Sequence, residues 1–386
     1  MRSLALCALL SGGCPPAPDS GDSVPPGPWD QPWPVAVTVD GQPLAEGSYA
    51  GIAPIWWVID TGAARTFVDA NLTSEGTGDV TVGPVTLEDV QVGLVDLSEA
   101  EAFIGWDLGG LAGQNFFDDR IVVVDYSASE AHFLDTLPED PPPGSGVGEV
   151  GYLPYALPSS IPVAPVTAAG AGEVAVELIA DTGSGVTILT ESTFAAVDDG
   201  TLPRLAGYVW ASNYGSDDAF ITRIPRLEAG GAVAEGTWAV VVPDDHHLRV
   251  ILEASGITSQ GFLGYPFYRR FWTGVDGFAR AYRFWPCADL SHEDPDEWHR
   301  AGIEPSWREG GFSVEMVFTP SSAASAGVQR GDRIVGLGDL DLATASADEV
   351  KRALRGPVGE GVHVSLDRDG TPLEADLTFQ DLLPEI

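Results

Sequence analysis

The chain has 386 residues, which is long enough for two or three domains with substantial cores. Asp and Glu outnumber Lys and Arg by 57 to 19, so the formal net charge is −38, and nucleic acid and anionic membrane surfaces are disfavoured as partners because they would be repelled. The 44% of apolar residues, with 46 Gly and 30 Pro, favours a loop-rich, mainly β protein over a helical one.

Residues 1–14 have the pattern of a secretory signal. Arg2 precedes an apolar run that is too short to span a bilayer. Small residues before Cys14 resemble a bacterial lipoprotein cleavage site, although Leu10 lies one place further upstream than is usual, and we expect Cys14 to carry lipid. The alternative is an ordinary signal peptide with an incidental cysteine. Both predict export to the periplasm or cell envelope. The lipoprotein also predicts membrane attachment, through the N-terminal lipid only.

Residues 15–34 are rich in Pro, Gly, Asp and Ser and are predicted to be a flexible tether. If Cys7 leaves with the signal and Cys14 carries lipid, only Cys287 remains of the three cysteines. The mature protein is then predicted to have no intramolecular disulfide.

Two short apolar runs each end in an Asp-Thr-Gly turn: residues 58–63 (VIDTGA) and 179–184 (IADTGS). Such a run is typical of a buried strand whose last residue points into a cleft. A carboxylate in a buried position is costly unless it is hydrogen-bonded or paired. The repeated motif supplies a partner, because two neighbouring carboxyls share one proton and titrate as a pair.

A second signal follows each motif. Residues 110–117 (GLAGQNFF) precede a predicted strand at 121–126, and residues 261–267 (GFLGYPF) precede one at 279–285. This repeated order resembles aspartic peptidases of the retropepsin and pepsin type. The resemblance implies a two-lobed β fold, a pseudo-dimer within one chain, with lobes at 35–135 and 150–287 and a linker at 136–149.

The resemblance makes Asp60 and Asp181 the catalytic pair. It implies that Thr61 and Thr182 hydrogen-bond across the lobe interface and that Gly62 and Gly183 let the backbone approach the carboxylates.

Ser184 is expected to hydrogen-bond the outer oxygen of Asp181, which Ala63 cannot do for Asp60. The two environments are therefore unequal, and the pKa values of the pair move apart. The sequence leaves open which Asp holds the shared proton.

Residues 208–222 are expected to form a hairpin around an Asn-Tyr-Gly turn. By resemblance it is the flap that closes over substrate, with Tyr214 and Gly215 at its tip; the alternative is a plain surface hairpin. In the first lobe only residues 71–78 separate the catalytic segment from the next strand, which leaves little room for a flap. No metal site is predicted, because adjacent His246 and His247 would point to opposite faces of an extended segment.

Residues 288–308 are predicted to be a linker with a short helix near 297–300, and residues 309–382 resemble a PDZ domain. Ser346 and Glu349 have capping-box spacing, which predicts a helix that runs through Leu354 and ends at Gly356-Pro357.

The PDZ resemblance implies that a polypeptide C-terminus binds as an added strand, with its carboxylate at the backbone N–H groups of Gly310, Gly311 and Phe312. The alternatives are that the chain itself occupies this groove or that the module merely packs against the lobes.

Together these features predict an exported aspartic endopeptidase with a polypeptide substrate, no cofactor and a PDZ domain that binds protein C-termini. The alternative is a catalytically inactive scaffold protein that retains the peptidase fold. The intact pair of Asp-Thr-Gly motifs favours the enzyme, because a scaffold has no need of two buried facing acids, and the short first-lobe flap region keeps the scaffold hypothesis open.

Overall fold

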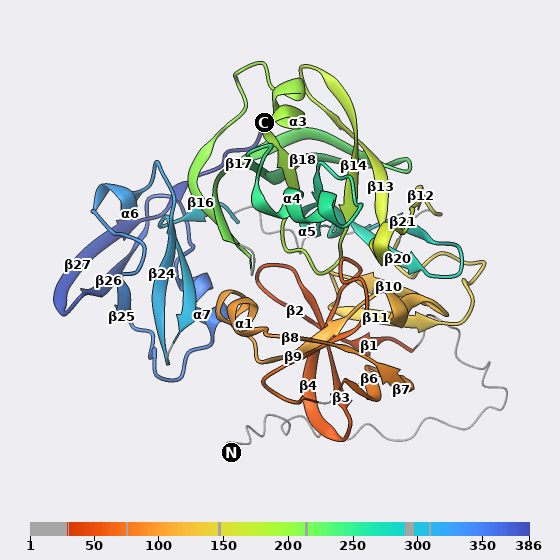
Figure 1. The fold of residues 1–386 in the computed structure, drawn as a ribbon. Coiled ribbons are helices and arrows are strands. Elements are labelled where there is room, and N and C mark those ends of the chain that lie inside the picture. Colours follow the sequence, from red (N-terminus) through yellow and green to blue (C-terminus); the bar gives the residue numbers. More distant parts are fainter. Residues whose placement is uncertain are drawn as a thin grey trace, which may run out of the picture.

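The computed structural model describes residues 29 and 31–386 apart from 75, 146–147, 213–214, 289, 291–296 and 309, and for residues 210–212, 215–218, 248 and 251 the backbone alone. The predicted signal, Cys14 and most of the predicted tether lie outside the described residues. No helix in the described part is both long and apolar enough to cross a membrane. The prediction of a mainly β, two-lobed fold is confirmed (Figure 1).

The first lobe is one eight-stranded sheet with two short helices. Its elements are β2 (Ala36–Val37), β3 (Pro43–Tyr49), β4 (Ile52–Ile59), β5 (Phe67–Asp69), β6 (Thr77–Val82), β7 (Val85–Gln91), β8 (Gly93–Val95), α1 (Ser98–Ile104), β9 (Leu108–Ala112) and α2 (Gln114–Phe117). β4 is exposed at its start and buried at its end, so the chain enters the core just before Asp60.

The second lobe is a seven-stranded sheet in which β13 also pairs with β17, so that the sheet curls on itself. Its elements are η1 (Pro158–Ser160), β13 (Val163–Ala169), β14 (Glu173–Ala180), β15 (Ile188–Thr190), α3 (Glu191–Val197), β16 (Leu205–Ser212), β17 (Gly215–Ala229), β18 (Ala232–Val242), α4 (His247–Ala254), β19 (Gly261–Leu263) and α5 (Tyr265–Tyr268). β14 has the same inward course as β4 and ends just before Asp181.

A six-stranded sheet joins the lobes. In spatial order it contains β1 (Trp33–Pro34), β11 (Glu130–Leu134), β10 (Ile121–Asp125), β20 (Phe271–Asp276), β21 (Ala281–Pro286) and β12 (Gly151–Pro154). The lobes meet where β10 pairs antiparallel with β20, with Val123 opposite Gly274. Since β10 and β20 follow the two return segments in the chain, the sheet fixes where both return segments end.

The C-terminal module, residues 299–381, lies beside both lobes and faces α1 (Figure 1). Its elements are β22 (His299–Arg300), β23 (Ile303–Arg308), β24 (Gly311–Val317), α6 (Ser322–Ser325), β25 (Arg333–Leu337), α7 (Ala347–Ala353), β26 (Gly361–Arg368), β27 (Thr371–Thr378) and β28 (Gln380–Asp381). The predicted capping box at Ser346 and Glu349 is confirmed at the start of α7.

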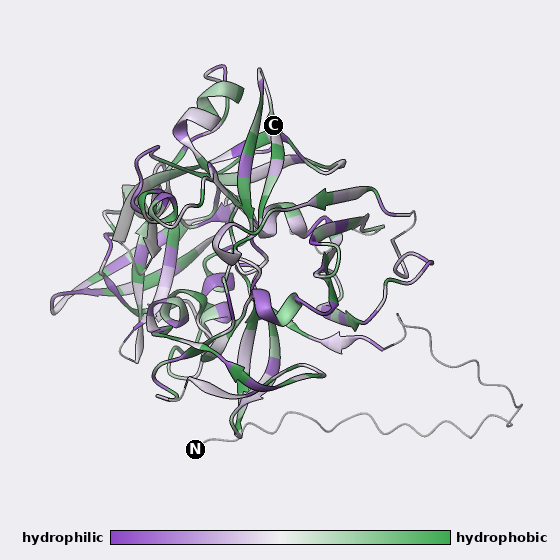
Figure 2. Cartoon of the chain, turned by 45° about the vertical axis from the view of Figure 1, so that its right-hand side comes forward, coloured by the Kyte–Doolittle hydropathy of each residue, from purple (hydrophilic) through white to green (hydrophobic). Residues whose placement is uncertain are grey.

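Hydrophobic segments lie mainly along the strands, and many hydrophilic ones lie in loops and at strand ends (Figure 2). One continuous core runs through both lobes and the joining sheet, and the C-terminal module has its own core around Phe312.

Two predicted boundaries were wrong. The predicted tether includes buried Trp29, which packs on Trp272, and strand β1. The predicted linker 288–308 contains β22, where a short helix was expected, and β23, which belongs to the five-stranded sheet of the module.

Candidate active site

Asp60 and Asp181 lie on two loops of matching geometry. Each follows a strand that runs parallel to the strand of the return segment, β4 beside β9 and β14 beside β19. The backbone N–H of Asp60 donates to the Ala112 carbonyl at 3.1 Å, and that of Asp181 donates to the Leu263 carbonyl at 3.0 Å. The two return segments therefore support both loops in the same way.

The glycine that ends each return segment allows this close packing. A Cβ atom on Gly113 would lie 2.1 Å from the Arg65 carbonyl oxygen, and one on Gly264 would lie 2.1 Å from the Val186 carbonyl oxygen. No side chain fits at either position, because real Cβ contacts do not occur at such distances.

Thr61 and Thr182 join the two loops by reciprocal hydrogen bonds, and both side chains are fully buried. The Thr61 hydroxyl donates to the Ala180 carbonyl at 2.9 Å and accepts from the Thr182 backbone N–H at 3.0 Å. The Thr182 hydroxyl donates to the Ile59 carbonyl at 2.7 Å and accepts from the Thr61 N–H at 3.1 Å. The two hydroxyls thus form hydrogen bonds with four buried backbone groups across the lobe interface.

Gly62 and Gly183 lie against the opposite carboxyl groups. A Cβ atom on Gly62 would lie 2.4 Å from Cγ of Asp181, and one on Gly183 would lie 2.6 Å from Cγ of Asp60. Each glycine therefore leaves the space that the acid of the other lobe fills.

The two carboxyls are hydrogen-bonded to each other. Burial raises the pKa of both, and the neighbouring Asp181 charge raises the pKa of Asp60 further. Backbone N–H groups of Gly62, Gly183 and Ser184 face Asp181 and partly offset the effect of burial on its pKa. Backbone N–H groups of Ala63, at 3.0 Å, and Gly62 act on Asp60 in the same way, so Asp60 has two such donors and Asp181 has three. The two carboxyls share one proton and titrate as a pair.

The predicted role of Ser184 was wrong in one respect. Its hydroxyl donates to the Val186 carbonyl at 2.8 Å, and it is its backbone N–H that faces Asp181. The inequality of the two environments thus arises from backbone donors, which any residue type supplies.

Two supporting side chains were missed from the sequence. Buried Gln114 donates from Nε2 to the Thr61 carbonyl at 2.5 Å, and the Tyr282 hydroxyl donates to the Ala180 carbonyl at 2.6 Å. The position of Gln114 directly after the return-segment glycine was the only sequence signal for either of them.

A cavity of about 670 Å³ opens above the two carboxyls. Its lining is mostly apolar, and it comes from both lobes and from the C-terminal module. From the second lobe Tyr208 and Val209 of β16 and Ile221 of β17 contribute. This volume lies within the range of about 300–1,000 Å³ that ligand pockets typically have.

The predicted flap corresponds to the hairpin of β16 and β17, whose strands pair from Leu205 opposite Ile221 to Ser212 opposite Gly215. Tyr214 lies outside the described residues. Among the described residues of the first lobe, none between 77 and 91 lines the cavity. The Gly83 turn of the β6–β7 hairpin packs against Trp33 and Phe133 of the joining sheet instead, and α1 lines the cavity on that side.

The predicted peptide groove of the C-terminal module is occupied by the chain itself. β23 pairs with β24 from Ile303 opposite Val317 to Arg308 opposite Gly311, and β25 pairs along the other edge of β24. Gly310 forms the turn between β23 and β24 with a φ of +77°, and Phe312 is buried. Because β23 takes the edge to which a peptide would add, the prediction of a carboxylate site at Gly310, Gly311 and Phe312 was wrong.

Among the described residues, no group of three or more His, Cys, Asp or Glu side chains is arranged to hold a metal ion. The chain matches no family model and no curated protein. Among solved structures it is similar to the aspartic proteinase from Irpex lacteus, with 12% identity, coverage of 68% of this chain and 98% of that chain, and a TM-score of 0.42. The interpretation of the site therefore depends on the geometry described above.

Proposed function

We propose that the chain is an aspartic endopeptidase that hydrolyses peptide bonds with a water molecule activated between Asp60 and Asp181. The observation that carries the proposal is the hydrogen-bonded carboxyl pair, one member from each of two matching loops, at the floor of a cavity. Two carboxyls that share one proton supply a base and an acid together, as in aspartic proteases.

The unequal donors give each carboxyl a role. Ionised Asp181 takes a proton from water as the water oxygen bonds to the peptide carbonyl carbon, and Asp60 gives its proton to the carbonyl oxygen. The resulting diol collapses when its C–N bond breaks. The amide nitrogen then receives the proton held by Asp181, one diol hydroxyl returns its proton to Asp60, and the acid and amine products leave.

The test is cleavage of a diverse library of extended, apolar-rich peptides from acid to neutral pH. Asp60→Asn and Asp181→Asn are each expected to abolish cleavage nearly as far as the double variant, because residues that act as a unit are not additive. Asp119→Asn, which changes an exposed acid that does not line the cavity, is the matched control and should retain activity.

The rate of wild-type cleavage should be bell-shaped in pH, with the two macroscopic pKa values of the pair. A wild-type protein that cleaves nothing in this range contradicts the proposal. Activity that persists in Asp181→Asn would show that the second motif is structural.

We also propose that the protein is exported and attached to a membrane by lipid on Cys14. The support is the sequence of residues 1–14. Cys14→Ser should lose incorporation of a labelled fatty acid and release the protein from membranes. Unchanged labelling in this variant would rule the assignment out.

A further inference from the structure

The C-terminal module forms one wall of the cavity that holds the two aspartates. The lining includes Ser306 and Arg308 of β23, Glu315 and Met316 of β24, and Phe318, which directly follows β24. A separate recruitment domain on a linker would contribute no residue to the site. The module must therefore be considered as part of the cleft.

The module also holds the base of the β16–β17 hairpin, the proposed flap. The backbone N–H of Ala206 donates to the Thr319 carbonyl at 3.1 Å, and the N–H of Thr319 donates to the Ala206 carbonyl at 2.8 Å. Next to this bridge, a Cβ atom on Gly207 would lie 2.1 Å from the Val317 carbonyl oxygen. The hairpin backbone thus contacts the module backbone with no room for a side chain.

Apolar packing reinforces this backbone bridge. One buried cluster combines Tyr208 and Trp238 of the second lobe with Trp298, Met316 and Phe318. The rings of Trp238 and Trp298 meet edge to face with centroids 5.4 Å apart, and Trp298 meets Phe318 at 6.1 Å. Aromatic groups buried together in this way tie the hairpin side of the cleft firmly to the module.

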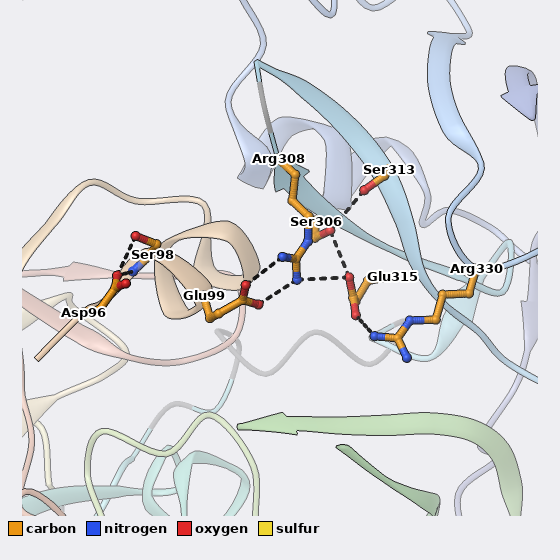
Figure 3. Close-up of polar contacts among 8 residues, drawn as sticks. All are labelled: Asp96, Ser98, Glu99, Ser306, Arg308, Ser313, Glu315 and Arg330. Carbon is orange, nitrogen blue, oxygen red and sulfur yellow. Dashed lines mark hydrogen bonds and ion pairs between the residues drawn. The ribbon is translucent and has the colours of Figure 1, made fainter. Parts of the chain in front are cut away.

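The module is also bound to the first lobe. Arg308 forms a bidentate ion pair with Glu99 of α1, at 2.9 and 2.8 Å, and its other partner is Glu315, which also pairs with Arg330 (Figure 3). Deeper in the interface, Lys351 of α7 pairs with Asp40 and donates to the Phe103 carbonyl at 2.8 Å. The module therefore bridges the two lobes that carry the two aspartates.

We propose that the C-terminal module is the fixed support of the flap hairpin, and that Gly207 positions the hairpin by allowing its base to seat on β24. The inference rests on the proposed function, because it assigns the module to substrate binding in the same cleft. The base of the hairpin stays bound to the module through the catalytic cycle.

The first test compares Gly207→Ala with Gly200→Ala. Both glycines have a positive φ, +98° and +90°, so each substitution carries similar backbone strain. A Cβ at Gly200 meets no atom within 4 Å, whereas one at Gly207 collides with Val317. Gly207→Ala should lower kcat/KM by about 10²-fold, the loss typical when a cleft group is misplaced by about 1 Å. Gly200→Ala should stay close to wild type.

Hydrogen exchange of the amides in β16 and β17 gives a readout that does not depend on turnover. Faster exchange confined to this hairpin in Gly207→Ala, with wild-type exchange in Gly200→Ala, supports the inference. Equal exchange in the two variants overturns it. Because this comparison works even if the protein cleaves nothing, failure of the inference and failure of the proposed function are distinguishable.

A cross-link tests whether the support is fixed. Ala206 and Thr319 are exposed and form a hydrogen-bonded antiparallel pair, for which Cα atoms lie about 5.5 Å apart, within the range that a disulfide spans. The oxidised Ala206→Cys/Thr319→Cys protein should keep wild-type hairpin exchange and wild-type kcat/KM. A loss of kcat/KM that a reductant reverses would show that the hairpin must leave the module during turnover, and would overturn the proposal.

Discussion

Thr182→Val tests whether the lobe interface depends on the reciprocal threonine bonds. Valine has nearly the same shape, so the substitution removes the hydroxyl and preserves the packing. In the fully buried site, the Ile59 carbonyl loses its donor at 2.7 Å and the Thr61 N–H loses its acceptor at 3.1 Å. Two backbone groups are then buried without these partners.

The expected cost follows from those two groups. A buried donor or acceptor left unsatisfied costs about 1–3 kcal/mol, so Thr182→Val should lower the free energy of unfolding by about 2–6 kcal/mol. The loops should also shift relative to each other, and kcat should fall by about 10²-fold if the carboxyls move by about 1 Å.

The assay is urea unfolding followed by tryptophan fluorescence, with Thr66→Val as matched control. Thr66 is also fully buried, but within the described residues its hydroxyl has no hydrogen-bond partner. Its replacement by valine should therefore be neutral or stabilising. If Thr182→Val destabilises the protein no more than Thr66→Val does, the threonine bonds do not hold the lobes together.

Two further predictions concern titration and the module interface. Because the pKa of Asp60 is raised in the folded protein, wild-type stability should fall as pH rises from the unfolded value near 3.8 through the folded value. Asp60→Asn removes this loss, so the variant should melt at a higher temperature than wild type at pH about 7 and at the same temperature near pH about 3. An equal difference in melting temperature at both pH values would contradict a raised pKa of Asp60. Lys351→Met leaves Asp40 and Glu304 without this buried partner and should lower the free energy of urea unfolding by about 3–5 kcal/mol. Arg352→Met, on the exposed face of α7, should lower it by less than about 0.5 kcal/mol. Equal losses in the two variants would refute the role of Lys351 in joining the module to the first lobe.

The fold class and the candidate dyad could be predicted because their signals are local and repeated. An apolar strand, an Asp-Thr-Gly turn and a returning segment with its glycine each lie within one short stretch of sequence, and the chain repeats this order. Gly62 and Gly183 belong to the same motif, although the carboxyl that each glycine contacts lies in the other lobe.

The occupied groove of the module could not be found by resemblance, because the difference lies in loop length. β23 ends at Arg308 and β24 begins at Gly311, so the chain returns along β24 at once, whereas a longer connection would leave the edge of β24 free. The alternating pattern of residues 303–308 was a usable signal for β23, since Gly310-Gly311 follows it closely in the sequence.

Contacts between distant parts of the chain had no sequence signal. The hydrogen bonds between Ala206 and Thr319 join backbone atoms of residues more than a hundred positions apart. Such backbone hydrogen bonds do not require particular residue types, so the sequence does not reveal them. The same reason explains Ser184, whose backbone N–H, rather than its hydroxyl, faces Asp181.

The module completes a cleft that the two lobes alone leave open. Peptide hydrolysis between carboxyls requires that bulk water be excluded, since electrostatic interactions weaken in a solvated site. Within the described part of the first lobe, the β6–β7 hairpin contributes no residue to the cavity, because its turn packs on the joining sheet, and helix α1 lines the cavity on that side. The β23–β24 hairpin fills the remaining side, and Arg308 closes the gap to α1 through Glu99. Occupation of the β24 edge by β23 and closure of the cleft are thus two consequences of the same short turn.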